Sequence, residues 1–445
     1  MSAAAALARF AVTATPPEAL MPIIAPAIAD CFGCILAGAD SEVALRTREA
    51  IAPLGAGTAP VFGTQMSLPA PHAALTNAVA GHAWDLDDWE EPGNTHPTVV
   101  LLPALLAAAD LHPADGQTLA AAYAVGTEII MRLGEALSLD HYARGFHSTG
   151  TLGAIGAAGA VARLIGLDEA QATHALAIAG SQASGYTVQF GSNAKPLQAG
   201  FAARAGVEAA LLARVGATGQ AQVLDHPRGF AGLMGDHDPS RLEAMAERLG
   251  APWALDQYGL ILKPWPSCGY THRLMTAALE LRPQLAGCLS EVAGIHAWMP
   301  DFHHAILPFH QPKSRNEALF SAPACLAQAL VTGGLTLADS EAAFWQAPEV
   351  ARLISLTSVT PEPARNPTLN YDPDQPDGLR ITLADGTTLE TTCALPLGAP
   401  GNPMSPEALA DKFHAITARP AQAVHGLLDW PAAPDISLFF KEMAQ

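Results

Sequence analysis

The chain has 445 residues, of which 50% are apolar and only 15% are charged, so it can bury a large core and does not have the composition of a disordered protein. Its formal net charge of −19 repels phosphate backbones, which argues against nucleic acid as a partner. The same charge repels anionic substrates at long range, so any site for an anion must gather the few cations locally.

The N-terminal sequence MSAAAALARF lacks a basic region followed by an apolar core and a cleavage site, so we expect no signal peptide. The longest weakly polar stretch, 149–167, contains Arg163 and is built from Gly and Ala, which is typical of a buried helix. The six cysteines are scattered, as in proteins of a reducing compartment. We therefore expect a cytoplasmic protein with no membrane partner.

Cys31 and Cys34 form a C-x-x-C in an apolar helical pattern, which favours buried thiols over redox or zinc use.

Residues 1 to about 260 are predicted to form one helix after another. Pro103 suits the first turn of a helix, so one of these helices is predicted to begin there. Small residues dominate several of them, as in GAIGAAGAVA, and this predicts closely packed, buried helices. Apolar residues at helical spacing predict helices at 21–36, 70–83, 103–111, 119–137, 150–165, 169–181 and 196–215.

The pattern changes after about residue 260. Strands are predicted at 291–299 and 353–360, a helix at 316–332, and a hairpin at 379–391 that turns at Asp385-Gly386. The tail, 405–445, returns to a helical pattern. We predict a mainly α fold, in which an all-helical domain is formed by 1–260 with 395–445 and a smaller α+β lid domain by 261–394.

Four polar segments interrupt the apolar pattern. The first, GHAWDLDDWEEPGNTHP, concentrates carboxylates from Asp85 to Glu91 and ends near His96. A solvated acidic loop and a metal site are both open alternatives to an active-site role, since carboxylates and imidazole are metal ligands. The segment lacks the calcium-loop pattern, and no second histidine lies at i+4 as in zinc helices.

The second segment, YARGFHSTG, contains His147 before a helix that Ser148 or Thr149 can cap without it. The third, GSNAKPLQAG, contains Lys195, the first lysine of the chain, at a predicted helix N-terminus. Such an end favours an anion, and a partly buried lysine there can have a lowered pKa and act as base or acid. A structural histidine and a surface lysine are the alternatives for these two positions.

The fourth segment, LKPWPSCGYTHRL, brings Lys263, Cys268, His272 and Arg273 into one short stretch. A cysteine nucleophile with His272 as its base is conceivable, although cysteine is often simply buried. The sequence contains no dinucleotide fingerprint, phosphate loop or G-x-S-x-G motif.

Six separated segments resemble the MmgE/PrpD family, in the same order and across nearly the whole chain. The resemblance implies a large all-helical domain made from both chain ends, a smaller α+β lid domain and usually a homodimer. The segments are ADCFGCILAG, GHAWDLDDWEEPGNTHP, GFHSTGTLGAIGAAGAVARLIGL, NAKPLQAGFAARAGVEAALLA, KPWPSCGYTH and EALFSAPACLAQAL.

Activities known in the family are 2-methylcitrate dehydration, cis-aconitate decarboxylation and iminodisuccinate epimerisation. Each moves a proton at a carbon next to a carboxylate, and none is known to need a metal or an organic cofactor. The resemblance therefore implies a small di- or tricarboxylate substrate, with neither a cofactor nor a bound metal. The family's proposed site residues match Asp85, His96, His147, Lys195 and His272.

From these matches, His147 and Lys195 are the candidates for proton transfer, and Asp85 would orient a neighbouring histidine or lysine. Lys195, His272 and Arg273 would hold the carboxylates of the substrate. His96 would bind substrate or relay a proton. One difference from the family is local, because Trp89 follows Asp88 where the characterised decarboxylases and methylcitrate dehydratases have Thr.

The sequence thus predicts a lyase or isomerase that transfers a proton at the carbon alpha to a carboxylate, with dehydration as the family default. Epimerisation and decarboxylation are the alternatives within the family. A non-catalytic helical protein that binds carboxylates is the alternative outside the enzymes.

Overall fold

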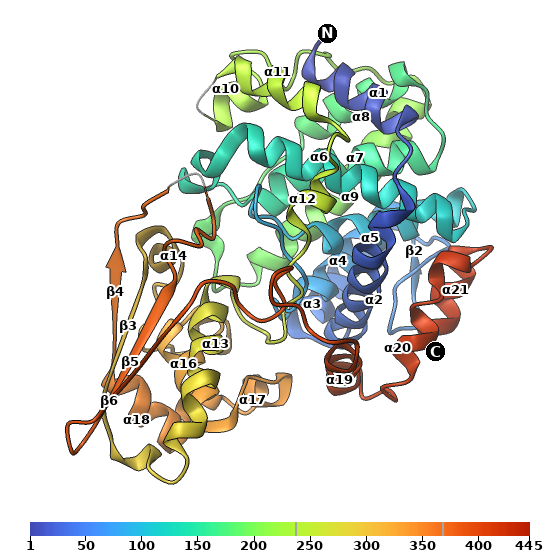
Figure 1. The fold of residues 1–445 in the computed structure, drawn as a ribbon. Coiled ribbons are helices and arrows are strands. Elements are labelled where there is room, and N and C mark those ends of the chain that lie inside the picture. The colour runs from blue at the N-terminus through green and yellow to red at the C-terminus, as the bar shows by residue number, and fades with distance from the viewer. Residues whose placement is uncertain (236–237, 367–368) are drawn as a thin grey trace.

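The computed structural model describes residues 1–235, 238–366 and 369–445. The fold is mainly helical with a smaller mixed-sheet part, which confirms the predicted fold class (Figure 1). The helices of the first part are α1 (Ala3–Thr13), α2 (Met21–Gly38), α3 (Glu42–Ile51), α4 (Ala70–His82), α5 (Pro97–Leu111), α6 (Gly116–Ala143), α7 (Ser148–Leu164), α8 (Glu169–Gly180), α9 (Ala194–Arg214), α10 (Phe230–Met234), α11 (Pro239–Arg248) and α12 (Ala254–Tyr258).

Close packing of helix backbones holds the helical bundle together. Sixteen of the seventeen residues of α7 are buried, and Gly206 of α9 lies so near α7 that a Cβ there would be 2.4 Å from the Cβ of Ala157. The predicted bundle of buried, small-residue helices is therefore confirmed. The predicted start of a helix at Pro103 is wrong, since α5 begins at Pro97. Pro97 occupies the first turn, where a missing N–H costs nothing, and Pro103 lies inside the helix.

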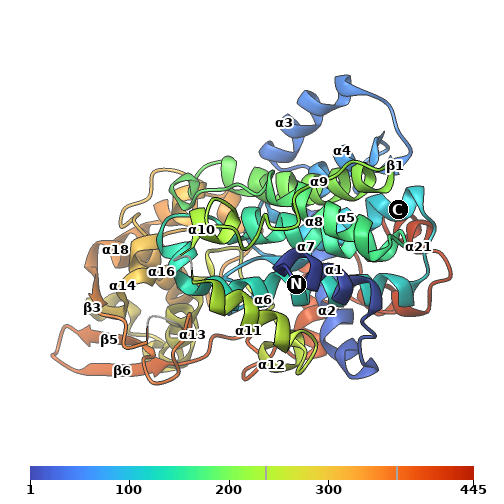
Figure 2. The ribbon, with the colours of Figure 1, turned by 90° about the horizontal axis from the view of Figure 1, so that it is seen from above.

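A four-stranded sheet dominates the second part, at one end of the molecule (Figure 2). Its order is β4-β3-β5-β6, with β3 and β4 parallel and the other neighbours antiparallel. The strands are β3 (Val292–Pro300), β4 (Thr357–Glu362), β5 (Asp377–Leu383) and β6 (Thr388–Cys393), and a separate pair is formed by β1 (Ala59–Pro60) and β2 (Ser67–Leu68). The helices around the sheet are α13 (His272–Leu281), α14 (Asp301–Ile306), α15 (Arg315–Ala318), α16 (Ala322–Thr332), α17 (Leu337–Glu341) and α18 (Pro348–Leu356).

The predicted hairpin is confirmed, with Gly386 at a φ of +87° in the turn between β5 and β6. The predicted strand at 353–360 is wrong in its first half. Leu353 and Ile354 lie in the last turn of α18, where they and Val350 are buried at helical spacing, and the strand begins only at Thr357. A short run of apolar residues does not by itself distinguish a helix end from a strand.

The C-terminal tail folds back on the first part of the chain. Its helices α19 (Pro406–Thr417), α20 (Ala423–Leu427) and α21 (Ile436–Met443), red in Figure 1, lie beside the blue N-terminal helices. Phe440 packs edge-on against Phe32 with ring centroids 4.8 Å apart, and Lys412 Nζ lies 2.7 Å from the Asp30 carboxylate. The tail thus shares one apolar core with helices from residues 3–260, whereas Trp89 and residues from 261–399 form a second core. The domain boundaries drawn from the sequence stay a prediction.

Cys31 and Cys34 are buried, free thiols in α2, as predicted. Among the described residues, the helical stretch Glu18–Gly38 alone has the length and apolarity of a membrane span, and 61% of its most apolar window is buried inside the protein. Buried core helices and N-terminal signal sequences pass the same test, so this stretch is weak evidence for a membrane span.

The contact between α7 and α9 gives a stability prediction. Gly206→Ala should lower the free energy of unfolding by about 1–3 kcal/mol, because the new methyl group must push two tightly packed backbones apart. Gly294→Ala in β3 is the control, since a Cβ there meets no atom of the described residues within 4 Å. Urea unfolding of both variants measures the difference, and equal stabilities would contradict the close packing described here.

Candidate active site

A pocket lies where the two apolar cores meet, and all four polar segments reach it directly. Its walls come from the loop after α4, the segment before α7, the start of α9 and the residues before α13. The side chains and glycine that line it are Asp85, Trp89, Asn94, His96, Tyr142, His147, Phe190, Lys195, Cys268, Gly269, Tyr270 and Phe320.

The Asp85 carboxylate lies between two lysines. Its Oδ2 is 2.7 Å from Lys195 Nζ, and its Oδ1 accepts a hydrogen bond of 2.6 Å from Lys263 Nζ. Lys263 is fully buried and also donates to the Asp85 carbonyl oxygen at 3.0 Å. Asp85 adopts a φ of +53°, a left-handed conformation that aspartate tolerates better than most residues with a side chain.

These contacts shift the pKa of each charged group. Burial would raise the pKa of the Asp85 carboxyl, but Lys195 and Lys263 hold it far below its usual range. Burial lowers the pKa of the Lys195 ammonium, Asp85 opposes that shift, and Lys263 adds to it. Lys195 therefore gives up its proton more readily than a surface lysine.

His147 presents a free imidazole nitrogen. Its Nδ1 lies 2.5 Å from Gln198 Oε1, and Gln198 Nε2 donates to the carbonyl oxygen of Tyr186 at 3.2 Å. The amide orientation places the proton on Nδ1, which leaves a lone pair on Nε2. That nitrogen is buried and has no hydrogen-bond partner in the described structure. Burial, followed by the charge of Lys195, holds the pKa of His147 well below its usual range, so the ring is neutral.

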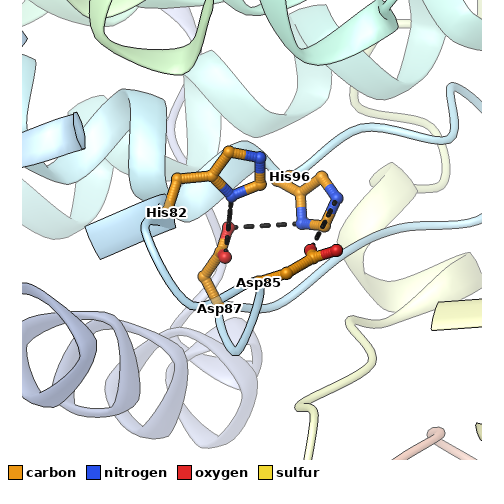
Figure 3. Close-up of side chains that lie close together, drawn as sticks. All are labelled: His82, Asp85, Asp87 and His96. Atoms are coloured by element: carbon orange, nitrogen blue, oxygen red, sulfur yellow. Dashed lines mark hydrogen bonds and ion pairs between the residues drawn. The ribbon is translucent and has the colours of Figure 1, made fainter. Parts of the chain in front are cut away.

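Behind the pocket, Asp87 joins two histidines (Figure 3). Its carboxylate lies 2.8 Å from His82 Nδ1 and 3.2 Å from His96 Nδ1, and His96 Nδ1 is also 2.9 Å from the Asp88 carbonyl oxygen. His96 Nε2 lies 3.8 Å from the Asp85 carboxylate. Burial lowers the pKa of His96 to about 3. The ring of His96 is thus neutral, and the Asp88 carbonyl and the Asp87 carboxylate fix its position.

The side chains of His82, Asp85, Asp87 and His96 offer ligand atoms within 4.8 Å of one another, which bears on the metal alternative. The donor types would suit a cation. The charges around them do not, because the ammonium groups of Lys195 and Lys263 already bind Asp85 and would repel a dication. The contacts fit a hydrogen-bonded support for His96 better than a metal centre.

The alternative of a solvated acidic loop is wrong. Asp85, Asp87, Asp88 and Glu90 are each less than 5% exposed. Glu90 accepts hydrogen bonds from the backbone N–H groups of Gly93 and Thr95, and burial raises its pKa to about 7. The loop therefore folds inward around its own carboxylates, which composition alone does not reveal.

His272 and Arg273 do not line the pocket. His272 begins α13, where its Nε2 lies 3.2 Å from Ser267 Oγ, and burial lowers its pKa to about 3. Arg273 points into the second core, with its guanidinium 3.4 Å from Asp377 and 4.0 Å from the centre of the Tyr371 ring. The geometry gives no support to the predicted contacts of these two side chains with substrate, and both roles stay predictions.

From the same segment, Cys268 and Gly269 reach the pocket instead, one turn earlier in the chain. Burial raises the pKa of the Cys268 thiol to about 11, which argues against a thiolate nucleophile. Two residues that support the site, Lys263 and Gln198, had no role predicted from the sequence. Lys263 carried a signal, as the second lysine of the chain in an apolar segment, whereas nothing in the sequence pairs Gln198 with His147.

Two family models cover most of the chain, the MmgE/PrpD N-terminal domain over residues 4–243 and the MmgE/PrpD C-terminal domain over 265–425. The chain belongs to the MmgE/PrpD family. It is 30% identical to cis-aconitate decarboxylase of Homo sapiens over 386 residues, which is 84% of this chain and 77% of that protein. It is also 30% identical to the Mus musculus cis-aconitate decarboxylase, over 78% of this chain and 72% of that protein. The cis-aconitate decarboxylase of Aspergillus terreus is 28% identical over 81% of this chain and 77% of that protein.

The buried carboxyl of Asp88 gives a pH-dependent stability prediction. It accepts hydrogen bonds from Thr98, and burial raises its pKa to about 8, so the folded state keeps it protonated where the unfolded chain ionises it. The free energy of unfolding should therefore fall as pH rises from about 4 to 8.

Asp88→Asn should remove that part of the pH dependence, because the amide cannot ionise. The variant should gain stability over the wild type between pH 5 and pH 8, by roughly 4 kcal/mol. Thermal unfolding at several pH values measures the gain. Other buried carboxyls titrate alike in both proteins, so a difference that is constant with pH would contradict the assignment.

Proposed function

We propose that this protein is a lyase that releases CO₂ from a small di- or tricarboxylate of the cis-aconitate type. The observation that carries the proposal is the single carboxylate of Asp85 shared by Lys195 and Lys263 at the pocket. Two ammonium groups on one carboxylate leave a positive charge that a substrate carboxylate can neutralise. The names of the relatives support decarboxylation over dehydration, which was the sequence-based default.

Decarboxylation requires the protein to supply a single proton. When the bond to the leaving carboxylate breaks, CO₂ departs and the electron pair stays on the remaining carbon skeleton. One proton must then reach carbon, and the Lys195 ammonium is the acid in the pocket, with a pKa lowered by burial. Solvent returns a proton to Lys195 after product leaves.

Dehydration is the second candidate, because His147 supports it. The neutral ring holds a buried, unpartnered Nε2 at the pocket, and a base at that place can remove the α-proton of a hydroxy acid. Dehydration and epimerisation need this base together with an acid, whereas decarboxylation needs the acid alone. His147 and Lys195 supply both, so only product analysis distinguishes the reactions.

The deciding experiment is an NMR assay in deuterated water with cis-aconitate, 2-methylcitrate and iminodisuccinate as substrates. We expect loss of CO₂ from cis-aconitate and one deuteron on carbon in the product. A new alkene from 2-methylcitrate would support dehydration, and deuterium uptake with inversion would support epimerisation. A ligand-induced rise in melting temperature without any turnover would support a binding protein and contradict the proposal.

Lys195 should be essential for turnover. Lys195→Ala should lower kcat by about 10²–10⁴-fold, the range for loss of a general acid. Lys195→Arg should keep KM near the wild-type value and still lose most of kcat, because a guanidinium binds carboxylate but does not release a proton. Lys313→Ala, at an exposed position, is the control. Near-normal kcat in Lys195→Arg would exclude Lys195 as the proton donor.

The rate should also depend on pH through Lys195. The proposed acid must be protonated, so kcat/KM should fall as pH rises through the pKa of Lys195, which burial places below the ordinary value of 10.5. A rate–pH profile from pH 6 to pH 10 tests this. A profile that is flat to pH 10 would show that no lysine of lowered pKa limits the reaction.

The homodimer and the cytoplasmic location expected from the sequence stay predictions. Light scattering after size-exclusion chromatography measures the first directly.

A further inference from the structure

The indole of Trp89 is held rigidly at the pocket wall. Trp89 is 3% exposed, and its backbone exchanges two hydrogen bonds with Ile261, at 3.1 and 2.9 Å. The ring packs edge-on against Tyr371, with centroids 5.0 Å apart, and against Tyr270 at 6.3 Å. A Cβ at Gly269 would lie only 3.1 Å from Trp89 Nε1, so this glycine leaves the room that the indole fills.

The indole N–H has no partner in the described structure. Trp89 Nε1 is buried without a hydrogen bond, although the indole is a donor and cannot serve as acceptor. Its polar neighbours at this wall are satisfied, since Asn94 Nδ2 donates to Tyr270 OH at 2.8 Å and Tyr270 OH donates to Asn370 Oδ1 at 2.8 Å. A buried donor without an acceptor is unfavourable, and a ligand in the pocket can supply the acceptor.

Trp89 and Lys195 belong to different walls of the pocket. Lys195 lies at the start of α9, and its Nζ is 5.3 and 5.0 Å from the ring centres of Phe190 and Phe320. Trp89 lies in the loop after α4 and packs on Tyr270 and Tyr371. A ligand that contacts both the indole N–H of Trp89 and the ammonium of Lys195 therefore needs two hydrogen-bond acceptors. The acceptor at Lys195 must be an anionic group.

We propose that the indole N–H of Trp89 donates a hydrogen bond to a carboxylate of the substrate other than the one bound by Lys195. Trp89 is then a specificity-determining residue, which selects acids with an additional carboxylate. This inference rests on the proposed function for the chemistry of the substrate, and its test uses binding, so that the two can fail separately.

The test is isothermal titration of the wild type and Trp89→Phe with propane-1,2,3-tricarboxylate. Phenylalanine keeps an aromatic ring and removes the donor. We expect affinity to fall about tenfold, as for loss of a hydrogen bond to a charged group. Trp345→Phe, a buried tryptophan elsewhere in the second core, should bind like the wild type.

Two dicarboxylates identify the contact. Glutarate lacks the central carboxylate, and methylsuccinate lacks a terminal one. Trp89→Phe should leave the affinity for at least one of them within about twofold of the wild type, because the acceptor is already missing, whereas a purely structural role would weaken all three acids alike. If Trp89→Phe does not fold, Gly269→Ala replaces it, since the new Cβ displaces the indole.

The outcomes test the role of Trp89 and the proposed lyase activity separately. Weaker binding of the tricarboxylate with an unaffected dicarboxylate supports the role of Trp89, even if the wild type turns over none of the acids tested. Equal binding of the tricarboxylate by the wild type and by Trp89→Phe overturns the role of Trp89. Turnover of cis-aconitate by the wild type would in that case still support the proposed function. Failure of the wild type to bind any of the three acids also overturns the role of Trp89.

Discussion

The ion pairs of Asp85 with Lys195 and Lys263 are the interaction on which the rest of the site depends. They connect three segments far apart in the sequence, the loop after α4, the start of α9 and the first residues of the second core. In a buried setting each charge needs the others, and removal of one partner leaves an uncompensated charge that is strongly destabilising. The two halves of the chain must therefore pack together for these charges to be compensated, and the same packing forms the site.

The same charges explain why neutral histidines surround the pocket. Burial and the nearby lysines hold the pKa values of His96 and His147 far below the ordinary value, so both rings act as hydrogen-bonding groups and not as cations. The positive charge of the site is then concentrated on the two lysines, of which Lys195 lines the pocket, where the proposed anionic substrate would meet it. A protein with a strongly negative net charge can bind an anion only through such local concentration.

Much of this site was predictable from the sequence, because rare polar residues stood out in apolar helices. Asp85, His96, His147 and Lys195 do converge, as their order and the family resemblance suggested. Sequence could not determine which side of the turn before α13 faces the pocket, and Cys268 occupies the place expected for His272. Likewise the acidic loop gave no sign that its carboxylates turn inward, since that depends on backbone N–H groups such as those of Gly93 and Thr95.

The backbone pairing of Trp89 with Ile261 also limits how the two halves can move. Two hydrogen bonds join the loop that carries Asp85 to the chain just before Lys263, and the ion pair of those residues lies beside them. A hinge that opened through this point would have to break both hydrogen bonds and expose a buried charge at once. A movement that keeps these bonds must therefore turn about the pairing of Trp89 with Ile261.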